Sequence, residues 1–264
     1  MISFIKKQIV TIFGGTKSKE ASSLSELVIL IDYDNIKSIF RQRGLVHVVD
    51  RIMLNISPSI SKVYNRYRLR LYGGWYESNN LSRNAQMLSA EISSNYPDVR
   101  KIKKNDKESS SIINVELAFS LESDHKHKLF NTYRKNRTPH GIRSAKRPFN
   151  QCSNPKSCTL DCIPSFLNKK KCPDHTCQAS LNDILIKNEQ KLVDTMLTSD
   201  IIFLSFRDND EVCVVTSDDD IWPGINTALF NNTQLIHLHT HSNRKTPAYY
   251  IPHGVQNYTQ INMT

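Results

Sequence analysis

The sequence has no long uninterrupted hydrophobic run, and it has almost no cysteine outside one short stretch. The N-terminal stretch MISFIKKQIVTIFGG is apolar, but Lys6 and Lys7 interrupt it. It therefore lacks both the apolar core of a signal peptide and the length of a membrane span, and we expect a cytoplasmic protein. Five of the six cysteines lie between Cys152 and Cys177, and Cys213 stands apart. This clustering favours a metal site in a reducing compartment over a disulfide framework.

Acidic residues are scarce in one region of the chain. Residues 124–177 contain twelve Lys and Arg against three Asp, a net charge of +9 out of +10 for all 264 residues. Such a local positive field favours a polyanionic partner, with nucleic acid ranked before an anionic membrane surface. The alternative is a solvated, disordered run of charge.

Two apolar runs end in carboxylates. The first, 27–35, reads LVILIDYDN, and a short β-branched run of this kind is typical of a strand that is covered on both faces. The second, 212–216, reads VCVVT and continues into SDDD. In open α/β sheets ligands collect at the carboxyl ends of the strands. If both strands are parallel and central, their polar ends face one cleft, with Asp32, Asp34, Asn35, Ser217, Asp218, Asp219 and Asp220 at its edge.

Hydrophobic periodicity places the remaining elements. It predicts an amphipathic helix over 2–13 and a flexible connection up to residue 26. Further helices are expected over 36–57 with a break near Gly44, 80–95, 182–206 and 222–230, and strands over 67–72, 111–121 and 234–239. This alternation predicts a mostly parallel α/β sheet flanked by helices. We expect the domain to comprise 27–123 and 181–241, with a basic, Cys-rich insertion over 124–180 and a surface tail over 242–264.

Several carboxylates in one cleft repel one another, so at neutral pH they need a cation or must hold protons. Hard divalent ions with oxygen ligands, Mg²⁺ or Mn²⁺, meet this need. Such an ion activates water and neutralises charge on a phosphate. Together with the basic region, the pattern indicates phosphodiester hydrolysis, and the candidate ligands are Asp32, Asp194, Asp218 and Asp220.

Four pieces of the sequence resemble the NYN domain, a branch of the PIN-like nucleases. They are DYDN with Asp32 and Asn35, LYGGWY at 71–76, KLVD with Asp194, and VVTSDDDIWPGI with Asp218 and Asp220. They extend from about residue 27 to residue 238, outside the insertion. The turn TSDDDI lacks the glycines that are usual in the family, and the Cys-rich insertion is not part of the common domain.

The resemblance implies a PIN-like fold and a metal-dependent ribonuclease, which we expect to be an endoribonuclease. It implies that the acidic residues hold Mg²⁺ or Mn²⁺ and that Asn35 orients the site. The catalytic candidates are therefore Asp32, Asn35, Asp194, Asp218 and Asp220.

Each of these residues has a plainer interpretation. Asp34 or Asn35 could cap the following helix, and for Asp34 we favour that role. Asp219 is expected to be a turn residue, and Asp218 alone could cap the helix near Pro223. Asp194 alone could lie on a solvated helix face, and Lys191 could contact phosphate or simply lie on the surface.

Two other functional classes remain open. Asp32-Tyr33-Asp34 after a buried strand also resembles the nucleophile and acid/base pair of haloacid dehalogenase-like phosphatases, in which Asp32 would form an aspartyl-phosphate. Phosphatases of that class have a wider carboxylate spacing than TSDDDI, and the KLVD helix has no role in them. We therefore rank this class second. The third class is a catalytically inactive module that binds RNA or a protein.

The cysteine spacing predicts a structural zinc site. Two short-spaced pairs can supply four thiolates, and a segment so poor in aliphatic residues needs the binding energy of a metal to fold. The ligands would be four of Cys152, Cys158, Cys162, Cys172 and Cys177, with His175 as a possible replacement. The alternative is a set of unpaired thiols in a disordered loop. Cys213 is expected to be a core residue.

The cationic residues around these cysteines are the candidates for RNA binding, with DNA as a further possibility. They are Arg134, Lys135, Arg137, Arg143, Lys146, Arg147, Lys169, Lys170 and Lys171. We hypothesise that a zinc-stabilised basic module captures RNA for the acidic cleft.

Overall fold

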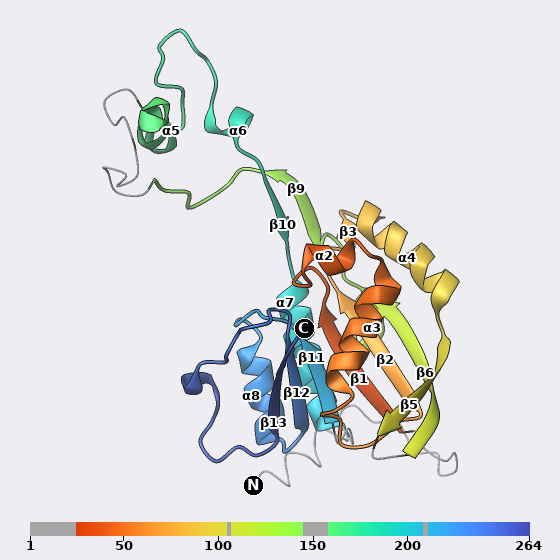
Figure 1. Cartoon of the computed structure of the whole chain (residues 1–264). Coiled ribbons are helices and arrows are strands. Elements are labelled where there is room, and N and C mark those ends of the chain that lie inside the picture. The colour runs from red at the N-terminus through yellow and green to blue at the C-terminus, as the bar shows by residue number, and fades with distance from the viewer. Residues whose placement is uncertain (1–24, 105–106, 145–157, 208–210) are drawn as a thin grey trace. The chain divides into compact units, whose positions relative to one another are not determined.

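The computed structural model describes residues 25–104, 107–144, 158–207 and 211–264, and its main feature is a seven-stranded sheet (Figure 1). All neighbouring strands are parallel except β5 and β6, which pair antiparallel. In sheet order the strands are β13 (Tyr258–Asn262), β12 (Gln234–His239), β11 (Glu211–Val215), β1 (Glu26–Asp32), β2 (Arg66–Tyr72), β6 (Lys107–Leu117) and β5 (Asp98–Lys104). The predicted α/β class with a mostly parallel sheet is confirmed.

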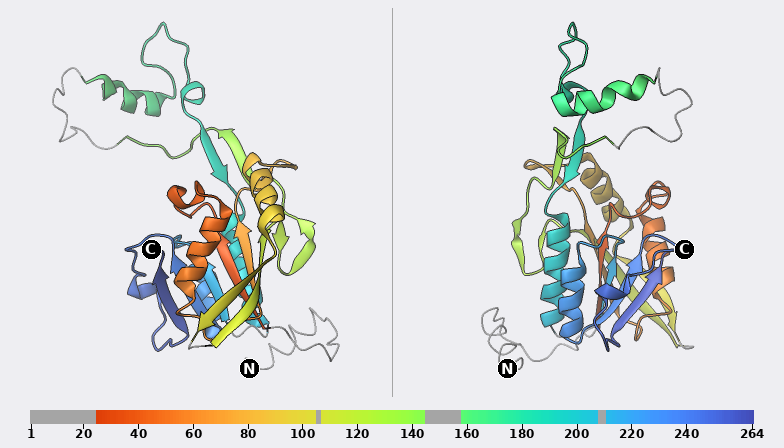
Figure 2. Two further views of the ribbon diagram at one scale, coloured as in Figure 1. Left: turned by 45° about the vertical axis from the view of Figure 1, so that its right-hand side comes forward. Right: turned by 90° about the vertical axis from the view of Figure 1, so that its left-hand side faces the viewer.

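Helices cover both faces of this sheet (Figure 2). One face packs against α3 (Leu45–Ile56) and α4 (Arg83–Asn95), and the other against α7 (Val193–Phe206) and α8 (Trp222–Phe230). Strand β1 alternates between the two cores, because Leu27, Ile29 and Ile31 face the first and Val28 and Leu30 face the second. This double burial explains the continuous apolar run, in which each Leu or Ile contributes about 1.5–3 kcal/mol.

The predicted break near Gly44 is confirmed. A short helix, α2 (Ser38–Arg41), ends before Gly44, which has a φ of 92°, and α3 starts at Leu45. Helix α4 begins after Ser82, whose side chain accepts a hydrogen bond from the Ala85 backbone N–H at 3.2 Å. Two small hairpins complete this part of the chain, one formed by β3 (Tyr76–Glu77) and β4 (Asn80–Leu81), the other by β7 (Ser120–Leu121) and β8 (Asp124–Lys128).

Residues 133–190 form a compact unit of their own, separate from the unit made by 1–132 and 191–264. It contains the antiparallel pair β9 (Tyr133–Arg137) and β10 (Lys187–Gln190), the 3₁₀ helix η2 (Thr159–Cys162), α5 (Ile163–Lys169) and α6 (Leu181–Ile184). The insertion predicted over 124–180 is therefore shifted along the chain. The two residues of the larger unit that flank it along the chain are hydrogen-bonded, because the Lys191 backbone N–H donates to the Thr132 carbonyl at 2.9 Å.

The single helix predicted over 182–206 is wrong. Helix α7 starts only at Val193, because Leu192 adopts a φ of 68° that interrupts helical geometry. Ile184 and Ile186 fit the apolar spacing, yet they are 57% and 63% exposed and belong to the smaller unit.

The segment 242–264 is not only a surface tail. It contains η3 (Ala248–Tyr250) and the edge strand β13, and the Tyr250 ring stacks on Trp222 with centroids 5.0 Å apart. Its polar composition suits an edge strand, which is covered less completely than a central one. The helix predicted over 2–13 lies outside the described residues. Within those residues, no helix is long and apolar enough to cross a membrane.

Candidate metal centre

The carboxyl ends of β1, β11 and β12 lie at one edge of the sheet, because these three strands are adjacent and parallel. Asp32 is the last residue of β1, and the loop after β11 carries Asp218 and Asp220. Asp194 lies in the first turn of α7. We call Asp32, Asp194, Asp218 and Asp220 the acidic centre.

Three of these residues converge closely. Carboxylate oxygens of Asp194, Asp218 and Asp220 all lie within 4.8 Å of one another. Partial burial raises the pKa of Asp194, and the negative charges of Asp218 and Asp220 raise it further. Three carboxylates at this spacing favour a bound cation, and an all-oxygen ligand set suits Mg²⁺ or Mn²⁺.

Asp32 lies beside this trio in a more enclosed position, where it is only 5% exposed. Burial raises its pKa to about 7, the Thr216 hydroxyl opposes that rise, and the charge of Asp194 adds to it. Its two oxygens accept hydrogen bonds from the Thr216 hydroxyl at 2.9 Å and from the Asn35 backbone N–H at 3.3 Å. Without a cation Asp32 can therefore exchange a proton near neutral pH, whereas a nearby cation would favour its ionised form.

Asn35 joins the ends of three strands and does not cap a helix. Its side-chain oxygen accepts a hydrogen bond from the Ser217 backbone N–H at 2.9 Å and from the Thr240 hydroxyl at 2.7 Å. Ser217 follows β11, and Thr240 follows β12. The amide thus fixes the loop that carries two carboxylates of the acidic centre.

The sequence interpretation placed Ser217 at this edge but gave no role to it or to Thr216. Thr216 donates to Asp32 and accepts a hydrogen bond from the Asp218 backbone N–H at 3.0 Å. Ser217 accepts from the Thr240 backbone N–H at 2.9 Å. The only sequence signal was position, because each of these residues follows the last apolar residue of a central strand.

The favoured capping role of Asp34 is wrong, and the alternative of a cap at Asp218 is not realised either. Helix α2 follows Lys37 and has no side-chain cap, and the Asp34 carboxylate instead pairs with Arg41 at 3.2 Å and accepts from the Gly74 backbone N–H at 3.4 Å. Helix α8 also has no side-chain cap, and Asp218 accepts a hydrogen bond from the Asp220 backbone N–H at 3.1 Å. Both carboxylates satisfy loop or neighbouring groups in place of a helix end.

The neighbouring Asp219 and Lys191 are outside the trio. Asp219 lies in the turn before α8, as predicted, and forms an ion pair with Arg244. Lys191 is exposed and immediately precedes the turn into α7. Gly73, in LYGGWY, lies close to Asp34, since a Cβ at Gly73 would be 2.9 Å from an Asp34 oxygen and 2.6 Å from the Trp75 ring.

A buried histidine contacts the backbone of a residue that binds Asp32. His237 of β12 is fully buried, and one ring nitrogen lies 3.1 Å from the Thr216 carbonyl while the other lies 3.0 Å from the Tyr258 hydroxyl. Burial lowers its pKa to about 3, with a further contribution from His239. A neutral ring in this position holds the backbone of Thr216, whose hydroxyl binds Asp32.

The cysteines are brought together only in part. Cys172 and Cys177 lie within hydrogen-bonding contact of one another. The Asp174 backbone N–H lowers the pKa of Cys172, but the hydrogen bond to Cys177, desolvation and the neighbouring negative charges together outweigh it, and the net shift is upward. Cys158 and Cys162 bracket η2, Cys152 lies outside the described residues, and among those described no set of three metal-ligand atoms includes a cysteine or His175. One pair of thiols is thus close together among the described residues, and Cys213 is a buried core residue, as expected.

Two of the cationic candidates in the smaller unit line a hollow of about 370 Å³. Arg134 and Arg137 of β9 contribute to its wall together with Thr138, His140 and Glu189. The other cationic candidates in the described part of this unit are exposed, namely Lys135, Arg143, Lys169, Lys170 and Lys171. Lys146 and Arg147 lie outside the described residues.

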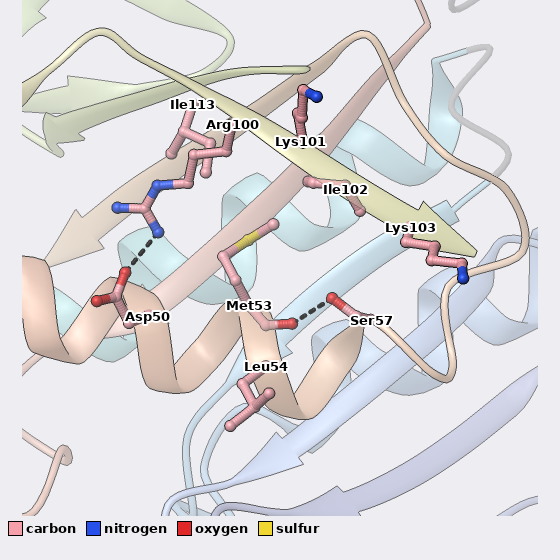
Figure 3. Close-up of a pocket in the computed structure, with 9 residues that line it drawn as sticks. All are labelled: Asp50, Met53, Leu54, Ser57, Arg100, Lys101, Ile102, Lys103 and Ile113. Atoms are coloured by element: carbon pink, nitrogen blue, oxygen red, sulfur yellow. Dashed lines mark hydrogen bonds and ion pairs between the residues drawn. The ribbon is translucent and has the colours of Figure 1, made fainter. Parts of the chain in front are cut away.

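A separate hollow of about 250 Å³ lies between α3 and strands β5 and β6 (Figure 3). Its apolar wall includes Met53 and Ile102, and Arg100 at its rim pairs with Asp50. It contains no residue of the acidic centre, so we do not assign it to the same site.

The fold and its acidic edge define an α/β protein with a candidate divalent metal site at the carboxyl ends of parallel strands. A scan against protein-family models and searches of curated proteins and of solved structures found no match.

Proposed function

We propose that the chain is a Mg²⁺- or Mn²⁺-dependent nuclease that hydrolyses phosphodiester bonds in RNA. The observation that carries the proposal is the convergence of Asp194, Asp218 and Asp220 within 4.8 Å, next to the buried Asp32. The net charge of +9 on residues 124–177 supports a polyanionic substrate. The choice of RNA, and the assignment to a PIN-like endoribonuclease, depend on the resemblance to the NYN domain.

In this proposal Asp194, Asp218 and Asp220 hold the ion, and Asp32 completes or borders the ligand set. The bound ion supplies an activated water and neutralises charge on the phosphate. Asn35 keeps the loop after β11 in place through its bonds to Ser217 and Thr240. Beside a bound cation Asp32 would be ionised, which suits it to the ligand set.

The geometry weighs against the phosphatase. A haloacid dehalogenase-like mechanism needs Asp34 as a mobile acid/base, but its carboxylate is paired with Arg41 and the Gly74 backbone N–H. That mechanism also leaves Asp194, a member of the trio, without a role.

The test is cleavage of labelled single-stranded RNA, structured RNA and DNA with Mg²⁺ or Mn²⁺. We expect Asp218→Asn and Asp194→Asn to lower cleavage roughly 100-fold or more, the scale of losing one electrostatic contact to the reacting charge. Asp98→Asn on β5 removes a carboxylate at the sheet edge and should cleave like the wild type. Equal activity of all three variants, or release of phosphate from a phosphomonoester without RNA cleavage, would contradict the nuclease. RNA binding without cleavage would indicate the inactive module.

We further propose that the smaller unit binds RNA and is stabilised by zinc through its cysteines. Metal analysis of purified protein should find one tightly bound zinc per chain, and Cys172→Ser should reduce it. Zinc content that does not change in Cys172→Ser would exclude Cys172 as a ligand.

A further inference from the structure

A second polar hollow of the larger unit has a volume of about 350 Å³. Lys37 lines it together with the loop that follows β12, which contributes His241, Ser242, Asn243 and Arg244. All five side chains carry hydrogen-bond donors, and none is a carboxylate. A pocket of this composition fits an oxyanion. We call it the cationic pocket.

The loop of the cationic pocket is fixed by side chains of β13. Gln260 donates to the Arg244 carbonyl at 2.8 Å and accepts from the Thr246 backbone N–H at 3.0 Å. Asn262 donates to the Ser242 carbonyl at 3.2 Å. The edge strand thus gives the loop a defined course, which explains why polar residues face this end of β13.

Three connections join the cationic pocket to the acidic centre. Lys37 is two residues after Asn35, and His241 directly follows Thr240, which donates to Asn35 at 2.7 Å. Arg244 forms an ion pair with Asp219, which lies between Asp218 and Asp220 in the chain. A guanidinium has five N–H donors, so this pair leaves donors for an additional anion.

We propose that the cationic pocket binds a phosphate of the substrate strand next to the phosphate that is cleaved. The inference rests on the proposed nuclease function and deepens it. A polynucleotide carries a charge at every linkage, so a strand with one phosphate at the acidic centre brings a neighbouring phosphate to the adjoining loop. Lys37 and Arg244 offset the repulsion between the strand and Asp219, and they select the direction in which the strand runs.

The test measures cleavage of a short labelled RNA by Lys37→Ala and Arg244→Ala. We expect each variant to raise KM roughly tenfold, the scale of one charge-assisted hydrogen bond, with kcat changed less than about twofold. The matched control is Lys101→Ala, which removes the same charge on β5 at the opposite edge of the sheet. A KM of Lys37→Ala equal to that of Lys101→Ala would overturn the proposal.

Neutral methylphosphonate linkages locate the contact. In the wild type, a neutral linkage on one side of the cleaved position should raise KM roughly tenfold. For that same RNA, Lys37→Ala should not raise KM further, because the contact is already lost. If the effects of Lys37→Ala and of a neutral linkage on KM multiply at every position of the RNA, Lys37 acts only through general electrostatic attraction. That result would overturn the proposal. Asp219→Asn should lower KM, because it frees Arg244 for the phosphate.

RNA binding to the Asp218→Asn variant, measured by fluorescence anisotropy, distinguishes the cationic pocket from the nuclease function. If the wild type does not cleave RNA but loss of Lys37 weakens RNA binding, the result supports the cationic pocket and contradicts the nuclease. Metal-dependent cleavage with binding that is independent of Lys37 and Arg244 supports the nuclease and overturns the pocket.

Discussion

Asp32 is a buried acid whose proton affinity depends on what occupies the acidic centre. Its pKa is about 7 in the folded chain, against an ordinary value of 3.8. Between these values the folded state keeps a proton that the unfolded state has released, so the metal-free protein should lose stability as pH rises from 4 to 7. The loss is on the order of 4 kcal/mol at most. Urea denaturation of the metal-free protein across this range measures it.

Asp32→Asn should remove that part of the pH dependence, because the amide does not titrate. The variant loses one acceptor for Thr216 or Asn35, so the slope of stability against pH is the informative quantity. At pH 8 we expect Mg²⁺ to raise the melting temperature of the wild type more than that of the variant. A slope that is identical in the two proteins would contradict the assigned pKa.

His237 should produce a slope of opposite sign. The unfolded histidine takes up a proton near pH 6.5, whereas the folded residue does so only near pH 3, so acidification between these values favours unfolding. His237→Gln should therefore lose stability less steeply from pH 6.5 towards pH 3 than the wild type does, as measured by thermal denaturation. An unchanged slope would mean that the ring is not buried in its neutral form.

Residues that directly follow an apolar strand were predictable from sequence. Asp32, Asn35 and Asp218 lie in such positions, and the structure brings them to one edge. Thr240 was missed, because its role depends on β12 lying next to β11, which no local pattern states. Asp34 was assigned as a cap from local preference, whereas its partners Arg41 and Gly74 become neighbours only through folding.

Helix α7 carries Asp194 in its first turn and a buried carboxylate, Asp200, further along. The Tyr72 hydroxyl donates to Asp200 at 2.6 Å, and the Arg70 guanidinium lies 3.4 Å from the same oxygen. This polar contact fixes α7 on β2. Arg70 also pairs with Glu116 and Glu122, so it keeps partners if Asp200 is lost. The buried Tyr72 hydroxyl and the Glu122 backbone N–H, which donates to Asp200 at 2.8 Å, would then lack their acceptor.

Asp200→Ala should therefore destabilise the protein by about 2–4 kcal/mol in urea denaturation, because two buried donors lose their acceptor. Asp200→Asn, which retains an acceptor for Tyr72, should cost less. Ser199→Ala changes the neighbouring, exposed position of α7 and should remain within about 0.5 kcal/mol of the wild type. Equal free energies of unfolding for Asp200→Ala and Ser199→Ala would show that the buried contacts of Asp200 do not stabilise the protein.

Elements with a strong hydrophobic pattern were predictable, and polar ones were not. Strands β1 and β11 have continuous apolar runs because helices cover both faces. Strands β9, β10 and β13 are polar, so nothing in their composition separates them from loops. The start of α7 was missed because exposed isoleucines before Leu192 continue a helical spacing that the backbone does not follow.

Deletion of the smaller unit tests whether that unit binds RNA. Replacing residues 133–190 by Asn-Gly should leave the larger unit folded, because Thr132 and Lys191 are already joined by a backbone hydrogen bond. If the smaller unit supplies about four phosphate contacts, the slope of log affinity against log salt should fall by roughly 3 for single-stranded RNA. Anisotropy at several salt concentrations measures it, and an unchanged slope would contradict RNA binding by this unit.

In that shortened chain, the rise in melting temperature with Mg²⁺ serves as the control. It should persist, since Asp32, Asp194, Asp218 and Asp220 all belong to the larger unit. Loss of both the metal response and the cooperative transition would show that the larger unit needs residues 133–190 in order to fold.

The hydrogen bond between Thr132 and Lys191 also bears on how the chain tolerates changes of length. A segment that leaves and re-enters a domain at adjacent backbone positions costs the domain mainly loop-closure entropy, which grows only with the logarithm of segment length. Doubling the segment would cost about 0.6 kcal/mol. The smaller unit can therefore lengthen, shorten or be exchanged for another binding module, while the sheet that carries the acidic centre keeps almost all of its stability.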